Sequence, residues 1–124
     1  MDDYKEWLRF AHNDLEAAKW LCTKSEFSHI VIFHCHECIE KALKAIWIMQ
    51  GGTVRKTHDI RTLLQNVWDQ QTWLKDFEDG VADIHEYYGQ TRYPASENIG
   101  MDDARQCVVI AEVIFETISK HLDQ

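Results

Sequence analysis

Apolar residues recur at intervals of three and four along most of the chain, and this spacing limits the fold more than any other feature. Those intervals place residues on one face of an α-helix, whereas a strand would alternate polar and apolar residues. The 124 residues include one proline, and no segment carries a strand pattern or a repeat. We therefore predict an all-α, up-and-down bundle of four to five helices, with a single domain over residues 1–124. The first helix shows the pattern at Tyr4, Trp7, Leu8, Ala11, Leu15, Ala18, Leu21 and Cys22.

Polar residues and glycines between the periodic segments indicate where each helix begins and ends. A second helix, antiparallel to the first, is expected from the turn TKSEFS to Gly51 and Gly52, and a short helix over 60–68 follows. A fourth helix carries the apolar residues from Trp73 to Tyr88, and the polar loop GQTRYPASENIG separates it from a last helix. The residues predicted to cap or end these helices are Ser25 and Ser28, Thr57 or Asp59, Gly89 with Pro94, and Asp102.

The chain is acidic, and its sequence predicts a cytoplasmic location. Asp and Glu number 21 against 13 Lys and Arg, a net charge of −8, which argues against a broadly basic nucleic-acid-binding face but leaves room for a local basic cleft. The first residues, MDDYKEW, do not resemble a signal peptide, and no apolar run is long enough to span a membrane. We therefore expect a cytoplasmic location, in which the cysteines at 22, 35, 38 and 107 remain free thiols.

The run HCHEC at residues 34–38 contains five side chains that can each bind a metal ion. Successive helical residues turn by about 100°, so these side chains point in different directions and at most two of them could share an ion. The pairs His34 with Cys38 and Cys35 with Cys38 would need ligands from other helices, such as His12, Cys22 or Cys107. If Cys35 faces inward, it forms one apolar stripe with Val31, Cys38, Ile39, Ala42, Ile46 and Met49. We interpret the cysteines as core residues and predict no metal site.

The opposite side of this helix also carries apolar residues. Ile30, Phe33, Trp47 and Ile48 lie there among the charged residues Glu37, Glu40, Lys41 and Lys44. A helix with one face in solvent would not carry them. Either the helix is central and covered on both sides by its own chain, or part of it meets a second protomer across a twofold interface. A homodimer is compatible with both patterns.

Four segments carry a resemblance to a known family, namely WLRFAHNDLEAAKWL, CHECIEKALKAIWIMQGG, KTHDIRTLL and YYGQTRYP, in this order. With them, nearly the whole chain resembles the HEPN family. The resemblance implies a helical bundle that usually dimerises and is often encoded with a minimal nucleotidyltransferase, in many cases as a toxin and its antitoxin. Many relatives are metal-independent ribonucleases marked by an Arg followed, after four to six residues, by His. Here Arg92 and Arg105 have no His at that spacing, and Arg9 and Arg55 are followed by one too closely.

Arg92, Tyr93 and Pro94 form an RYP motif that resembles the short prokaryotic branch of this family. An Arg offers a planar fork of donors for phosphate, and an adjacent Tyr offers a ring to stack on a base and a hydroxyl to donate. Tyr88, one turn before Arg92, could project into the same cleft or fill the core. In the structural alternative, Arg92 bonds carbonyl groups at the helix end, Tyr93 packs on the bundle and Pro94 stops the helix.

Other charged residues have both a structural and a functional interpretation. Glu40 and Lys41 match the family pattern, and Lys41 and Lys44 are spaced to reach one phosphate, although we favour a solvated or interfacial ion pair. His58 is either a cap near a helix start, which we favour, or a proton-transfer group. His85 is interpreted as an ordinary exposed helix residue.

Three hypotheses about function follow. The first is a HEPN protein that dimerises, pairs with a minimal nucleotidyltransferase, and holds nucleotide or RNA near Arg92 and Tyr93. By the family resemblance, the partner could also modify Tyr93 or Tyr88. The second is a metal-independent ribonuclease toxin in which Arg92 stabilises the phosphate transition state. The third is a non-catalytic dimeric scaffold. None of the three requires a cofactor.

Overall fold

The computed structural model describes residues 3–93 and 99–123, and the regular elements within these ranges are all helical. In chain order they are α1 (Tyr4–Leu21), the 3-10 helix η1 (Ser25–Phe27), α2 (Ser28–Met49), α3 (Ile60–Val67), the 3-10 helix η2 (Thr72–Phe77), α4 (Glu78–Thr91) and α5 (Met101–Leu122). The prediction of an all-α bundle is therefore confirmed.

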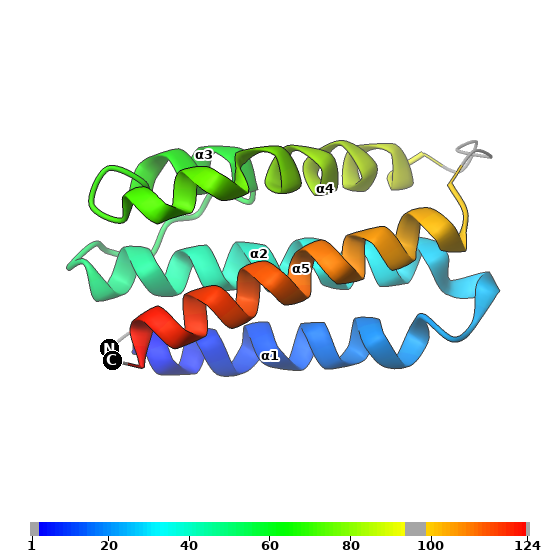
Figure 1. Cartoon of the computed structure of the whole chain (residues 1–124), viewed down its shortest axis with the longest axis horizontal. Coiled ribbons are helices and arrows are strands. Elements are labelled where there is room, and N and C mark those ends of the chain that lie inside the picture. Colours follow the sequence, from blue (N-terminus) through cyan, green and yellow to red (C-terminus); the bar gives the residue numbers. More distant parts are fainter. Residues whose placement is uncertain (1–2, 94–98, 124) are drawn as a thin grey trace.

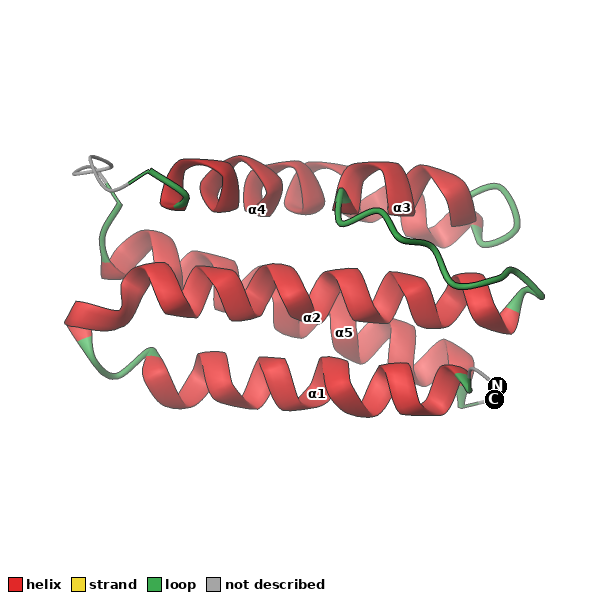
Figure 2. Ribbon diagram, turned by 180° about the vertical axis from the view of Figure 1, so that it is seen from behind, coloured by secondary structure: helices red, strands yellow, loops and turns green. Residues whose placement is uncertain are grey.

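Helix α2 lies at the centre of the bundle. It packs against α1, α3, α4 and α5. Figure 1 shows α1 antiparallel to α2 on one side, α3 and α4 on the other, and α5 crossing obliquely, with both marked chain ends at the same end of the bundle. The connection 50–59 runs back along α2 to the start of α3 (Figure 2). The apolar residues on both sides of α2 are therefore covered by the same chain over most of its length.

One predicted helix cap is confirmed by the structure and another is wrong. Asp59 caps α3 as expected, because its Oδ1 accepts hydrogen bonds from the backbone N–H groups of Arg61 and Thr62. Asp102, however, lies inside α5, and the residue before that helix is Gly100. The carboxylate of Asp103 reaches back to accept from the Gly100 N–H at 3.0 Å. The prediction for Asp102 was wrong because three acceptable acidic or glycine positions lie close together at this helix start.

The second helix and the fourth also begin differently from the prediction. Ser28 is the first residue of α2 rather than a cap in front of it, and the preceding residue, Phe27, makes no side-chain capping bond. The segment from Trp73 to Phe77 belongs to η2, so α4 starts only at Glu78. A 3-10 turn is common ahead of an α-helix, and apolar spacing alone does not separate the two. Helix α4 ends at Thr91, and Pro94 lies outside the described residues.

The core contains the apolar stripe predicted for α2. Cys35, Cys38 and Cys107 are buried, Cys22 is partly exposed, and all four are free thiols, as expected. Burial raises the pKa of Cys107 to about 12 and raises that of Cys35 and Cys38 as well. These three thiols are therefore inert packing groups. The one member of the stripe that is exposed is Met49, in the last turn of α2.

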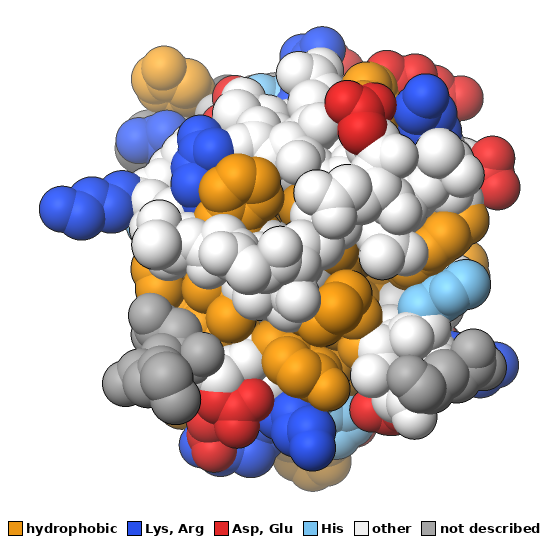
Figure 3. All heavy atoms as spheres, turned by 90° about the vertical axis from the view of Figure 1, so that its left-hand side faces the viewer, with side chains coloured by type: hydrophobic (Ala, Val, Ile, Leu, Met, Phe, Trp, Pro, Cys, Tyr) orange, Lys and Arg blue, Asp and Glu red, His pale blue; other side chains and the backbone are white. Residues whose placement is uncertain are grey.

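The surface combines charged groups with scattered apolar side chains. Figure 3 looks along the bundle onto the end where the chain termini lie, and apolar side chains gather there between charged ones. Elsewhere, large exposed apolar residues include Trp20 on α1, Ile30 and Phe33 on α2, and Val109 and Val113 on α5. No helix in the described part of the chain is both long and apolar enough to cross a membrane.

Candidate functional site

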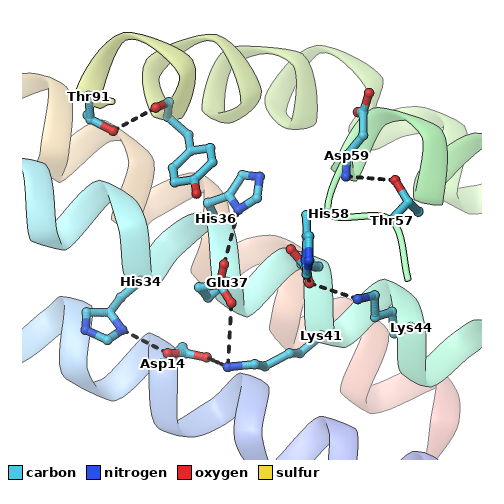
Figure 4. Close-up of polar contacts among 12 residues, drawn as sticks. Asp14, His34, His36, Glu37, Lys41, Lys44, Thr57, His58, Asp59 and Thr91 are labelled. Atoms are coloured by element: carbon cyan, nitrogen blue, oxygen red, sulfur yellow. Dashed lines mark hydrogen bonds and ion pairs between the residues drawn. The ribbon is translucent and has the colours of Figure 1, made fainter. Parts of the chain in front are cut away.

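A hollow of about 640 Å³ lies between α2, α4 and the end of the connection 50–59. It is lined by residues that can bind anions, stack on rings or transfer protons, and Figure 4 shows several of them from one side. The lining residues are Phe33, His36, Glu37, His58, Asp59, His85, Tyr88, Gly89 and Arg92. Residues from three segments that are distant in sequence therefore meet at one place.

Helix α4 contributes His85, Tyr88 and Arg92 to this hollow. Their spacing of three and four residues places them on one face of the helix. Arg92 immediately follows the last residue of α4 and is exposed to solvent. Its guanidinium is therefore available to a ligand at the mouth of the hollow.

The α2 side of the hollow is built around His36. Its ring is 1% exposed and stacks on the Tyr88 ring, with centroids 3.9 Å apart and planes inclined by 18°. Phe33 lies against the same Tyr88 ring, at 6.3 Å between centroids. These contacts fix the rings of α2 and α4 relative to each other and create an aromatic wall.

Below this wall, Glu40 is the centre of a buried ionic network. Its Oε2 accepts a hydrogen bond from Lys44 Nζ at 2.9 Å and lies 2.9 Å from His58 Nδ1. Both Glu40 and Lys44 are buried within the chain, and Lys44 Nζ also lies 5.6 Å from the centre of the Trp7 ring. The expectation of a solvated or interfacial pair was therefore wrong: α1 and the connection 50–59 cover this side of α2. The interpretation of His58 as a cap was also wrong, because its exposed side chain bonds Glu40 and Asp59 supplies the cap of α3.

A second ionic network links α2 to α1. Asp14 lies 2.8 Å from His34 Nδ1 and accepts from Lys41 Nζ at 2.5 Å (Figure 4). Lys41 Nζ also lies 3.9 Å from Glu37. Contact with His36 lowers the pKa of Glu37, with Lys41 adding to the effect, although burial acts in the opposite direction. The contact between Lys41 and Asp14 therefore links α2 to α1.

The predicted site residues divide into three groups. Arg92, Tyr88 and His58 line the hollow together, and the Glu40–Lys44 pair lies next to it. Lys41 faces Asp14, and Tyr93, which is 70% exposed, is not part of the lining. Pro94 lies outside the described residues.

Two histidines of the hollow, His36 and His85, were missed by the sequence argument. His85 precedes Arg92 by seven residues, or about two helical turns, which is a spacing that shares a face. His36, Glu40 and Lys44 recur every four residues on α2, a spacing that places them in one polar stripe along the helix. Both spacings were present in the sequence, but the contact between α2 and α4 was needed to bring the two stripes together.

The arrangement combines anion binding, ring stacking and proton transfer in one hollow. Arg92 supplies fixed positive charge, the aromatic wall of His36, Tyr88 and Phe33 supplies faces for stacking, and the three histidine rings carry nitrogens that can donate or accept hydrogen bonds. Among the described residues, His36, Glu37 and Glu40 also bring metal-binding atoms within 4.8 Å of one another.

Comparison with known proteins places the chain in a family. The sequence model that describes the HEPN domain family matches residues 4–122, so the chain belongs to the HEPN family. Among curated relatives, "Putative toxin MJ1304" of Methanocaldococcus jannaschii is 27% identical over 97% of this chain and 88% of that protein. The family assignment expected from the four sequence motifs is confirmed.

Solved structures share the fold over almost the whole chain. TT1696 from Thermus thermophilus superposes with a TM-score of 0.83 at 20% identity, covering 97% of this chain and 98% of the other. ST0689, an archaeal HEPN homologue, has a TM-score of 0.77 at 24% identity and covers 98% of both chains. At these identities the similarity establishes the fold alone.

Proposed function

We propose that this HEPN-domain protein binds a nucleotide or RNA in the hollow around Arg92, as one member of a toxin-antitoxin-like pair. The observation that supports the proposal best is the meeting of Arg92, Tyr88 and the imidazoles of His36, His58 and His85 in one solvent-accessible hollow of about 640 Å³. Such a volume accommodates a small ligand. The toxin name of the 27% identical relative supports the biological setting.

Each part of a nucleotide has a matching group in the hollow. The guanidinium of Arg92 can bind phosphate oxygens through two parallel hydrogen bonds. A base can stack against the aromatic wall, whose outermost member, Phe33, is 41% exposed. The carboxylates of Glu37 and Asp59 lie on the same lining and can accept hydrogen bonds from ribose hydroxyls or base amino groups.

The proposed partner is a minimal nucleotidyltransferase, and the proposed assembly is a homodimer. Ile30 and Phe33, in the first half of α2, remain exposed, whereas most of the apolar residues of that helix are buried. Exposed apolar residues grouped on one element favour a protein contact. If the partner transfers a nucleotide to a tyrosine, Tyr93 is the more accessible acceptor, because Tyr88 is stacked on His36.

The ligand proposal is tested by titrating the chain into a labelled single-stranded RNA and into labelled ATP, in EDTA, with fluorescence anisotropy as the readout. We expect Arg92→Ala to weaken binding at least about tenfold, because charge-assisted hydrogen bonds to phosphate contribute roughly 1.5–3 kcal/mol. The matched control is Arg105→Ala, which removes an exposed Arg on α5 that pairs with Asp102. Equal affinity of the two variants, or no binding by the wild type to either probe, would refute the proposal.

A metal-independent ribonuclease is the second candidate function, and it is supported by the histidines that line the hollow together with Arg92. The Arg to His spacing of active relatives is absent, but α4 carries His85 two turns before Arg92, and α2 and the connection add His36 and His58. A general acid or base can therefore come from another position in the chain. In the same EDTA mixture, cleavage of the RNA that disappears in both Arg92→Ala and His85→Gln would support this function, and intact RNA would exclude it.

A further inference from the structure

His36, Glu37 and Glu40 form a cluster that hydrogen bonding within the protein leaves incomplete. One ligand atom from each residue lies within 4.8 Å of those of the other two. Among the described residues, His36 Nδ1 and Glu40 Oε1 are buried side-chain atoms without a hydrogen-bond partner. Nδ1 of His36 lies 3.6 Å from Glu37 Oε1, which is beyond hydrogen-bond distance.

Buried polar atoms without partners are costly, and their presence calls for an explanation. Both residues are at least nine-tenths buried, with exposures of 1% for His36 and 3% for Glu40. The two unpartnered atoms are an imidazole nitrogen and a carboxylate oxygen, and they belong to two of the three residues whose ligand atoms cluster here, with Glu37 as the third. A cation at this point would satisfy both of them at once.

We infer that His36, Glu37 and Glu40 form a binding site for a divalent transition-metal ion at the base of the hollow. One imidazole nitrogen and two carboxylate oxygens are the donor types that Zn²⁺ accepts, and three protein ligands leave a coordination position open. His36 and Glu37 also line the hollow, so an ion held by them would lie beside the space that Arg92 lines as well. This set differs from the pairs predicted within the run 34–38, because Glu40 lies outside that run, one turn beyond His36.

The surroundings hold the ligands as a metal site requires. Lys44 and His58 both bond the other carboxylate oxygen of Glu40, Oε2, and so fix the side chain while Oε1 stays unpaired. The stack on Tyr88 fixes the His36 ring. Outer contacts of this kind orient the ligands of known metal sites. Tetrahedral Zn²⁺ needs ligand atoms roughly 3.3 Å apart, and Glu37, the most exposed of the three, can rotate to close the remaining gap.

Nearby cations set the expected strength of the site. Lys44 and Lys41 carry positive charge close to Glu40 and Glu37, and they reduce the attraction for a second cation. Lys41 is mainly neutralised by Asp14, at 2.5 Å, and Asp59 adds a carboxylate to the lining. Even with Arg92 counted, the carboxylates of Glu37, Glu40, Asp14 and Asp59 outnumber the cationic Lys and Arg side chains around the site.

The test is calorimetric titration of Zn²⁺ into the full chain after treatment with EDTA and removal of the chelator. We expect one Zn²⁺ per chain, and at least about tenfold weaker binding for each of His36→Phe and Glu37→Gln, since loss of a ligand should cost no less than loss of an outer contact. His36→Phe keeps a ring to stack on Tyr88, and Glu37→Gln keeps the side-chain size. The control is His12→Gln, which removes an exposed histidine paired with Glu16 at the same four-residue spacing.

The outcomes separate this inference from the proposed function. Absence of a one-to-one Zn²⁺ site, or a site that His12→Gln weakens and the two ligand variants do not, would overturn it. If circular dichroism shows that His36→Phe does not fold, Glu37→Gln decides, because that side chain is only partly buried. The inference does not rest on nucleotide binding: the metal is titrated alone, and the nucleotide titration is made in EDTA.

Discussion

At the scale of the residue, the buried Glu40–Lys44 pair is the feature whose energetics differ most from expectation. Two charges removed from water are stabilised mainly by each other, so removal of one leaves the other buried and uncompensated. We expect Lys44→Met to lower the free energy of unfolding by about 3–5 kcal/mol. Replacing Glu40 as well, with Met, should recover most of that loss, because a well-packed apolar pair often equals a buried ion pair in stability.

These changes in stability can be measured by urea denaturation of the single and double variants. Lys120→Met is the control, since it removes an exposed lysine from the last turn of α5 and should change the stability by less than about 0.5 kcal/mol. A loss for Lys44→Met no larger than that of the control would show that the pair is solvated after all, as the sequence alone had indicated.

At the scale of the element, the end of α2 depends on one glycine. Gly51 has a φ of +93°. Two backbone hydrogen bonds close the helix at this point: the Gly52 N–H donates to Trp47 O, and the Gly51 N–H donates to Ile48 O. We expect Gly51→Ala to destabilise the protein by about 1–2 kcal/mol, the cost of this conformation for an L-residue. Gly89→Ala should instead stabilise it by about 0.5–1 kcal/mol, because Gly89 is helical and an added Cβ meets no atom within 4 Å.

The two alanine variants form a matched pair, because the chemical change is the same and the expected signs are opposite. Thermal unfolding followed by circular dichroism should show a lower midpoint for Gly51→Ala and a higher one for Gly89→Ala. Midpoints that move in the same direction would contradict the assigned backbone conformations.

The same elements show how far the sequence could predict this molecule. Apolar spacing predicted that the chain forms helices and that Cys35 and Cys38 lie in the core. The glycines at 51 and 52 predicted where α2 ends. Apolar spacing could not separate η2 from α4, since both helix types place residues three apart on one side. The sequence also offered no reason to join Arg92 and His58 in one site. They come together through the packing of α2 against α4, which is a long-range contact.

At the scale of the whole molecule, the HEPN bundle uses its central helix for two purposes. One side of α2 supplies the apolar core, and the other supplies His36, Glu37, Glu40 and Lys44 to a polar layer beside the hollow. The proposed binding of an anion is compatible with an overall charge of −8, because Arg92 places a positive charge on the lining of that hollow. Helix α2 therefore contributes both to the core and to one wall of the candidate site.

The measurement that tests the central claim most directly is purification of the tagged chain from its source cell, with bound proteins identified by mass spectrometry and the native mass determined by light scattering. The account predicts a dimer that carries a minimal nucleotidyltransferase in stoichiometric amount, and nucleotide or RNA that is lost in Arg92→Ala but retained in Arg105→Ala. Recovery of a monomer with neither partner nor nucleic acid would contradict it.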